Sequence, residues 1–264
     1  MSELADDADL KSAGDFPVWV RVPPRAHSMH GLSVNKSFFS EWSSEMSYIF
    51  GFVVADGCIY VKRIKSDGTK YYNFNITSKD YSILEKIKEA MNAEQKIGKK
   101  RNGYFLQIGH QEICEDLLKL GMRVDKTHNF LGEINIPKKY FPDFVRGFFD
   151  GDGSVYIYEV NDTPQIKISF TSVDYNFLKW FNNKLCNVLD IPTKSLHEEN
   201  NKGKMSKYNI YFYVEDSEKI AELMYRNDPD LFLKRKKQIF KEWDSIERRD
   251  YKKKDYPSRI GRKV

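Results

Sequence analysis

The amino-acid sequence predicts an α+β fold built from two copies of one αββαββα unit, each with a four-stranded antiparallel sheet. Residues 77–84 return in similar form as residues 171–178, a spacing of 94. An apolar segment that ends in Asp-Gly recurs at 51–57 and 147–153, a spacing of 96. Because two segments recur in the same order at nearly the same offset, a tandem duplication explains them better than chance.

Each copy is expected to begin with a helix that ends at Asp-Gly. In the first copy, Ser43 is a candidate N-cap and Glu45 lies in the first turn, and we expect Gly57 to end the helix in the left-handed conformation. In the second copy, Pro142 begins the helix and Gly153 ends it. A hairpin is expected after each helix, at 58–64 with 71–77 and at 155–160 with 165–171.

The hairpin strands alternate between apolar and polar residues. Tyr72, Phe74 and Ile76 share one face of their strand, and Ile166, Ile168 and Phe170 do so in the second copy. A strand with this period buries one face and leaves the other in water. Helices are expected next at 80–92 and 174–188, then second hairpins around 101–103 and 198–207, and closing helices at 111–120 and 216–225.

These elements divide the chain into five predicted regions. They are an N-terminal extension (1–43), a first repeat (44–125), a linker (126–141), a second repeat (142–245) and a basic C-terminal tail (246–264). The extension is compatible with a flexible lead, a strand packed on the first repeat, or a remnant of exon-encoded sequence.

Charge is distributed unevenly along the chain. The net charge of the 264 residues is +5, but residues 1–16 sum to −4 and residues 234–264 sum to +8. A basic run can be simply a solvated helix face. Together with 16 tyrosines, which suit contacts to bases and phosphates, it favours a polyanionic partner.

Small residues recur at the same places in the two Asp-Gly helices. Gly51 and Ala55 match Gly147 and Gly151, so each helix has a strip on which another backbone can approach closely. If the strips pack together, the two aspartates that end the helices, at positions 56 and 152, lie side by side. Two carboxylates at the negative ends of two helix dipoles repel each other, and a shared proton or a divalent cation compensates.

Residues 48–57 and 144–153 resemble the two signature helices of a monomeric LAGLIDADG homing endonuclease. The resemblance covers about residues 44–245 and implies a pseudo-twofold protein whose two sheets form a DNA-binding saddle in the major groove. It implies site-specific cleavage of double-stranded DNA, one phosphodiester per strand, in the homing of a mobile intron or a free-standing gene. Asp56 and Asp152 then hold catalytic Mg²⁺, for which other divalent cations can substitute. The first motif departs mildly at Val54, where many members have aspartate.

The resemblance also implies helper residues near each aspartate. By position, Lys126 and Lys234 are the first candidates for the catalytic cations, and Lys236 is the next candidate. Ser78 and Ser172 fall where family members place a polar residue that positions water, although each could instead be the N-cap of the next helix.

The polar strand faces and nearby basic residues predict the DNA contacts, because a β-ribbon can reach base edges in the major groove. A register error of one residue would exchange the faces. The predicted contacts are Tyr60, Lys62, Tyr71, Asn73, Asn75, Lys99, Arg101, Gln107, Tyr156, Tyr158, Gln165, Lys167, Ser169, Asn209, Tyr211 and Lys236.

Two other functions on the same fold stay open: an RNA maturase, and a DNA-binding regulator that does not cleave. Glycosidase or aspartic protease chemistry is disfavoured, because the Asp-Thr-Gly and Asp-Ser-Gly signals are missing and the polar sheet face would have no role. A calcium loop starting at Asp150 is disfavoured, since Val155 takes the place of its glycine.

Location and assembly follow from what the sequence lacks. The three cysteines have no C-x-x-C spacing, so neither a disulfide framework nor a zinc cluster is supported. The N-terminal segment is acidic, unlike a signal peptide, and no apolar run is long enough for a membrane helix. We expect a monomer that binds double-stranded DNA but no membrane, in the cytoplasm or the organelle that holds the host intron, and not secreted.

Overall fold

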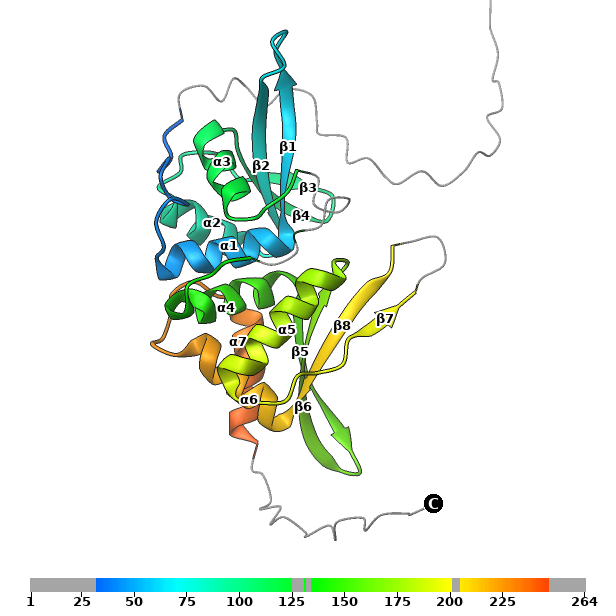
Figure 1. Ribbon diagram of the computed structural model, residues 1–264. Coiled ribbons are helices and arrows are strands. Elements are labelled where there is room, and N and C mark those ends of the chain that lie inside the picture. The colour runs from blue at the N-terminus through cyan, green and yellow to red at the C-terminus, as the bar shows by residue number, and fades with distance from the viewer. Residues whose placement is uncertain (1–31, 125–130, 132–133, 201–204, 247–264) are drawn as a thin grey trace, which may run out of the picture. The chain divides into compact units, whose positions relative to one another are not determined.

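The computed structural model describes residues 32–124, 131, 134–200 and 205–246 (Figure 1). The first repeat contains α1 (Ser44–Asp56), β1 (Gly57–Ile64), β2 (Lys70–Ser78), α2 (Tyr81–Ala90), β3 (Gly98–Lys100), β4 (Gly103–Ile108) and α3 (Gln111–Lys119). After a 3₁₀ turn at Lys138–Tyr140, the second repeat contains α4 (Phe141–Asp152), β5 (Gly153–Val160), β6 (Thr163–Ser172), α5 (Tyr175–Leu189), β7 (His197–Glu199), β8 (Lys207–Tyr213) and α6 (Val214–Tyr225). The boundaries predicted for the five regions stay predictions.

The two sheets have the same topology. Their strand orders are β1-β2-β4-β3 and β5-β6-β8-β7, and every pairing within them is antiparallel. Phe74 and Ile76 in β2, and Ile166, Ile168 and Phe170 in β6, are fully buried, so the predicted apolar faces are confirmed. The predicted α+β fold of two αββαββα units is likewise confirmed.

A β-bulge changes the register of β1 near its end. Tyr72 lies opposite Val61, but Tyr71 lies opposite Arg63, so Lys62 is the extra residue between the two pairs. Arg63 therefore takes the place beside Tyr71, with its guanidinium 4.8 Å from the ring centroid. A bulge has no reliable signal in a single sequence, and the strand prediction missed it.

Gly57 and Gly153 are not left-handed, which corrects the prediction for Gly57. Their φ angles are −93° and −87°, in the extended region, and each residue begins a strand directly at the end of its helix. Both positions require glycine for another reason, because a side chain there would have no space. A Cβ at Gly57 would lie 2.5 Å from the carbonyl oxygen of Val53, and one at Gly153 would lie 2.6 Å from that of Phe149.

Helices α1 and α4 pack side by side where the two repeats meet (Figure 1). A Cβ at Gly51 would lie 2.3 Å from the carbonyl oxygen of Phe144, and one at Gly147 would lie 1.9 Å from that of Tyr48. At Gly151, an added Cβ would meet the methyl group of Ala55 at 2.2 Å. The small residues thus allow two helix backbones to approach closely, and most of α1 and α4 is buried.

Replacing Gly147 by alanine is expected to destabilise the protein by about 2 kcal/mol, because the new methyl group meets backbone that cannot rotate away. Urea unfolding of the variant and the wild type measures the difference. Lys179→Ala, at an exposed position of α5, is the control and should change the free energy of unfolding by less than about 0.5 kcal/mol. Equal stability of Gly147→Ala and the wild type would contradict the close packing.

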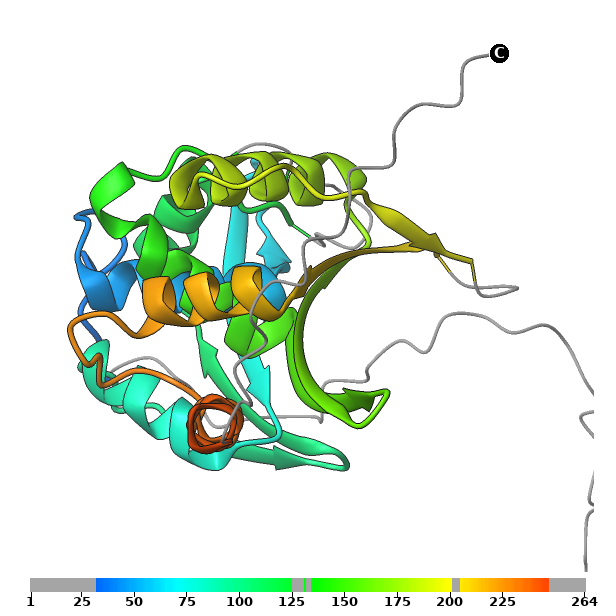
Figure 2. The same ribbon diagram turned by 90° about the horizontal axis from the view of Figure 1, so that it is seen from below.

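One helix lies outside the repeat scheme. Helix α7 (Lys234–Ser245) follows α6 in sequence but also contacts the first repeat (Figure 2). The guanidinium of Arg235 lies 3.0 Å from the carboxylate of Asp80, and the Lys86 ammonium donates to the carbonyl oxygen of Asp230. The segment after α6 therefore ties the second repeat to the beginning of α2.

The described part of the predicted N-terminal extension packs on the first repeat. Phe38 and Phe39 are buried, and the ring of Phe39 lies 6.3 Å from that of Phe74 on β2. Backbone hydrogen bonds join Asn35 to Met91 and Glu94 to Ser33. Residues 33–39 therefore add to the hydrophobic core of this repeat.

Candidate functional site

The two motif aspartates end the paired helices. Asp56 is the last residue of α1, and Asp152 is the last residue of α4. The Asp56 carboxylate points toward α4, since one of its oxygens lies 3.5 Å from the position that a Cβ on Gly151 would take. Asp56 is half-buried and Asp152 is exposed. The packing of the helices thus brings two carboxylate-bearing residues to the same end of the helix pair.

A polar cleft of about 480 Å³ opens beside Asp56. Its walls come from the ends of α1 and α4, the loop after β2, the β3–β4 turn, and the start of α7. Lys79, Lys100, Arg235 and Lys236 line it, so four basic residues share the cleft with Asp56. The sequence analysis missed the first three as site residues. Lys79 carried a usable signal, because it directly follows Ser78 in a duplicated segment whose second copy has Val173.

Lys236 lies in the interior and not on the surface. It is 5% exposed, and its ammonium donates to the carbonyl oxygens of Phe149 and Gly153 at 2.6 Å and of Asp150 at 2.9 Å. Burial lowers the pKa of Lys236 to about 8, against the opposing effect of carboxylates that include those of Asp56 and Asp152. The predicted DNA contact of Lys236 does not fit this burial. Its charge instead faces the negative end of α4, where cations stabilise helices.

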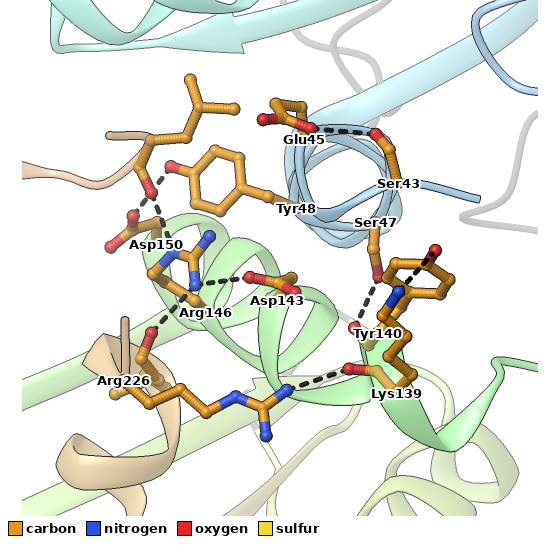
Figure 3. Close-up of polar contacts among 12 residues, drawn as sticks. Ser43, Glu45, Ser47, Tyr48, Lys139, Tyr140, Asp143, Arg146, Asp150 and Arg226 are labelled. Atoms are coloured by element: carbon orange, nitrogen blue, oxygen red, sulfur yellow. Dashed lines mark hydrogen bonds and ion pairs between the residues drawn. The ribbon is translucent and has the colours of Figure 1, made fainter. Parts of the chain in front are cut away.

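A buried polar network surrounds Asp150 (Figure 3). One oxygen of its carboxylate accepts hydrogen bonds from the Tyr48 hydroxyl and the Leu233 backbone, both at 2.8 Å. The other oxygen has no hydrogen-bond partner among the described residues. Burial raises the pKa of Asp150 to about 6, although the nearby Lys236 ammonium lowers it.

Arg146 extends this network to the segment before α7. Its guanidinium donates to the carbonyl oxygens of Leu231 at 2.8 Å and Met224 at 2.9 Å, and it pairs with Asp143 at 2.8 Å (Figure 3). The positions of α1 that are equivalent to Arg146 and Asp150 carry the apolar residues Phe50 and Val54. The charged residues of the network therefore occur only in α4, where they hold the chain that leads into α7, while Tyr48 joins the network from α1.

Replacing Lys236 by methionine is expected to lower the free energy of unfolding by about 3 kcal/mol, because three buried carbonyl oxygens lose a charged donor. Urea unfolding measures the change. Lys241→Met is the matched control, since Lys241 is exposed on the same helix. Equal stabilities for the two variants would show that the Lys236 hydrogen bonds contribute nothing.

The other predicted helper residues lie in different surroundings. Lys234 is exposed at the beginning of α7, and Lys126 lies outside the described residues. The hydroxyl oxygens of Ser78 and Ser172 each accept from a backbone N–H two residues on, at 3.1 Å, just before a helix. Both serines therefore make the turn that begins the next helix, and Ser78 also lines the cleft.

The open face of the first sheet carries several of the predicted DNA contacts. Tyr60 lies opposite Asn73, and Asn75 lies opposite Gln107, so these four residues share that face. Asn73 is only 3% exposed, and its amide donates to the Tyr60 hydroxyl at 3.2 Å. Its position corrects the prediction of a direct base contact, because burial leaves it no surface to offer. Lys99 and Arg101 are exposed in and after β3.

The open face of the second sheet is richer in tyrosine. Cross-strand pairs place the predicted contacts on one face, where Tyr156 lies opposite Lys167 and Tyr158 opposite Gln165. Ser169 and Asn209 also face this side but are less than a tenth exposed, and Tyr211 lies opposite Ser169. Tyr213 shares the face and was missed, although the two-residue period after Asn209 and Tyr211 indicates it.

The donor set around the helix ends fits a hard divalent cation. Mg²⁺ is usually held by one or two carboxylates with water and substrate phosphates, so Asp56 and Asp152 suit it. Among the described residues, no group of three or more histidine, cysteine, aspartate or glutamate side chains is placed to hold a metal. A caged structural metal of the zinc type is therefore not supported in that part of the chain.

The fold and the paired acidic helix ends define a two-repeat protein of the LAGLIDADG class. A sequence profile described as LAGLIDADG endonuclease matches residues 49–120, and one described as LAGLIDADG-like domain matches residues 143–225. Together they cover more than half of the chain, in tandem. The chain belongs to the LAGLIDADG endonuclease family.

Similar proteins include one sequence relative and solved structures of similar fold. An uncharacterized protein of Methanocaldococcus jannaschii is 29% identical over 194 residues, which are 69% of this chain and 63% of that protein's length. The LAGLIDADG homing endonuclease I-GzeII, solved in complex with its DNA target, is similar in fold with a TM-score of 0.51 at 16% identity, covering 77% of this chain and 89% of that one. The meganuclease I-SmaMI, solved on uncleaveable DNA, gives a TM-score of 0.50 at 16% identity, covering 75% and 88%. Among the described residues, no helix is long and apolar enough to cross a membrane.

Proposed function

We propose that this protein is a monomeric, site-specific endonuclease that hydrolyses one phosphodiester in each strand of double-stranded DNA. The observation that carries the proposal is the placement of Asp56 and Asp152 at the same end of the packed helices α1 and α4. Each aspartate also leads directly into the first strand of a sheet with a polar, aromatic open face. Its biological role is the homing of a mobile intron or a free-standing gene.

Phosphodiester hydrolysis requires an in-line attack by water and stabilisation of the charge that develops on the phosphate and the leaving oxygen. A divalent cation held by Asp56 and Asp152, Mg²⁺ in the first instance, would supply Lewis-acid stabilisation and an activated water. The basic side chains in the cleft beside Asp56 contribute fixed positive charge. Lys79, which lines this cleft, is our candidate to stabilise the leaving oxygen. Lys234 and Lys126 remain alternative cations, and Ser78 and Ser172 remain candidates for orienting water.

Selection of cleaved sites from a randomised DNA library, with and without Mg²⁺, tests this function. We expect the wild type to enrich one site that is cut in both strands, and only when Mg²⁺ is present. Recovery of bound but uncut DNA in the presence of Mg²⁺ would favour a non-cleaving regulator. Failure to bind any duplex, with binding to structured RNA, would favour a maturase.

DNA affinity is expected to fall steeply with salt, because the basic side chains release condensed counterions when they neutralise phosphates. The logarithm of the association constant should decrease by about 0.9 for each phosphate contact and each tenfold rise in salt. Fluorescence titrations in Ca²⁺, which should support binding without cutting, measure this slope. An affinity that is independent of salt would contradict phosphate binding by this chain.

A further inference from the structure

The two sheets can be compared position by position, because their pairing registers match. Tyr104 lies between Ser78 and Lys99, and Tyr208 lies between Ser172 and Glu198. The ring of Tyr104 also packs 5.1 Å from that of Tyr81 at the beginning of α2, and the ring of Tyr208 packs 5.1 Å from that of Tyr175 at the beginning of α5. Lys99 and Glu198 therefore occupy the same place in the two sheets.

Equivalent edges of the two sheets carry opposite charge. In the first sheet, the strand β3 presents Lys99 and Lys100, both exposed. In the second sheet, the equivalent strand β7 presents Glu198 and Glu199, also exposed. A DNA backbone that follows both strands is attracted by the charges on β3 and repelled by those on β7.

The β1–β2 and β5–β6 hairpins differ in charge in the same way. The β1–β2 hairpin carries four exposed basic residues and one acid, whereas the β5–β6 hairpin turns through Asn161 and Asp162 and carries Glu159. Over the described strands and turns, the first sheet has seven basic residues and one acidic, and the second has two basic and four acidic. Two further lysines at 202 and 204 would only bring the second sheet to a balance of zero.

The centre of the second sheet is the exception to its acidic edges. Lys167 lies on the open face with its ammonium 4.8 Å from the ring centroids of Tyr156 and Tyr211 and 5.9 Å from those of Tyr158 and Tyr213. Four rings hold this one cation in place by cation–π attraction. Its contact with the Tyr156 hydroxyl raises the pKa of Lys167, so the side chain stays charged.

The first sheet has no such cation at the matching position. Asn73 pairs with Tyr60 as Lys167 pairs with Tyr156, but Asn73 is buried and bound to that tyrosine. A lysine on the open face of a sheet suits guanine, whose O6 and N7 are both acceptors in the major groove. The aromatic rings around it suit stacking and apolar contacts with bases.

We propose that the two repeats divide DNA recognition unequally: the first sheet anchors the DNA through phosphates, and the second sheet reads sequence, with Lys167 as its central guanine contact. This inference rests on the proposed binding of double-stranded DNA. It assigns affinity mainly to the first half of the target and base discrimination mainly to the second half.

Binding-site selection in Ca²⁺ from a randomised duplex library tests the second sheet. Lys167→Gln should lose the preference for guanine at one or two adjacent positions by tenfold or more while leaving the other positions unchanged. Lys219→Gln is the matched control, because Lys219 is exposed on α6 and away from the sheet, and it should select the wild-type site. A uniform loss of affinity in Lys167→Gln, with the preferences intact, would make Lys167 a phosphate contact and overturn the assignment.

Salt titrations on the selected site test the first sheet. The double variant Lys99→Gln with Arg101→Gln should bind more weakly at every sequence, with a salt slope shallower by up to about 1.8. Glu198→Gln with Glu199→Gln should instead tighten binding, because it removes charges that repel the backbone. Weaker DNA binding by the variant that carries both Glu198→Gln and Glu199→Gln would overturn the proposed division of roles between the two sheets. If the wild type selects no duplex at all, the proposed function fails, and this inference fails with it.

Discussion

Replacing Asp56 or Asp152 by asparagine is expected to reduce DNA cleavage by about a thousandfold or more, while DNA binding persists. Asparagine has nearly the same shape as aspartate but lacks the negative charge that holds a divalent cation. Without that cation, the charge that develops on the phosphate has lost its main stabiliser. Conversion of supercoiled plasmid into nicked and linear products, for a plasmid that carries the selected site, measures the loss.

The same substitutions should leave the fold intact. Both aspartates lie at the negative end of a helix dipole and at the same end of the helix pair, so we expect that removing one charge relieves repulsion. We expect the thermal midpoint to stay the same or to rise slightly. Asp190→Asn, at an exposed position directly after α5 and outside both sheets, is the control that should change neither cleavage nor stability.

The products of the single variants distinguish two arrangements of the site. If each aspartate serves its own strand, Asp56→Asn and Asp152→Asn should each nick one defined strand, and the two nicks should lie on opposite strands. If the two carboxylates share one cation, both cuts should be lost together in either variant. A variant that still linearises plasmid at the wild-type rate would remove that aspartate from the active site.

Much of the fold could be predicted because it repeats. The duplicated Asp-Gly helices and the two-residue period of the strands are local patterns, and each copy supports the interpretation of the other. The glycines of α1 and α4 also predicted close helix packing, since glycine within a helix is costly unless something needs the space. The role assigned to Gly57 was wrong because helix-ending glycines usually adopt a positive φ, whereas here the chain enters a strand at once.

The surroundings of the site could be predicted less well, because they depend on contacts far apart in sequence. Lys236 belongs to a basic run that looks solvated, yet its ammonium binds carbonyl groups 83 to 87 residues away. No pattern in the neighbouring sequence indicates that Lys236 is buried. Asp150 is a similar case, since its partners Tyr48 and Leu233 come from the first helix and from the chain before α7.

Lys79 and Lys234 are competing candidates for the catalytic cation, and their different positions make the choice testable. Lys79 lines the cleft beside Asp56, whereas Lys234 is exposed at the beginning of α7 and is not among the residues that line this cleft. Both are basic, so removing either one takes the same charge from the protein. Only a cation close to the reacting phosphate can stabilise charge that develops in the transition state.

Lys79→Met is therefore expected to slow cleavage by about a hundredfold to a thousandfold while changing DNA affinity by less than tenfold. The loss should fall mainly on one strand, because the second repeat has Val173 at the equivalent position, so nicked plasmid should accumulate. Lys234→Met is expected to weaken binding slightly and to leave the rate of cleavage at saturating enzyme unchanged. Single-turnover cleavage rates and binding titrations in Ca²⁺ separate the two effects. The opposite result, slow cleavage in Lys234→Met and a normal rate in Lys79→Met, would move the catalytic cation from the β2–α2 loop to the first turn of α7.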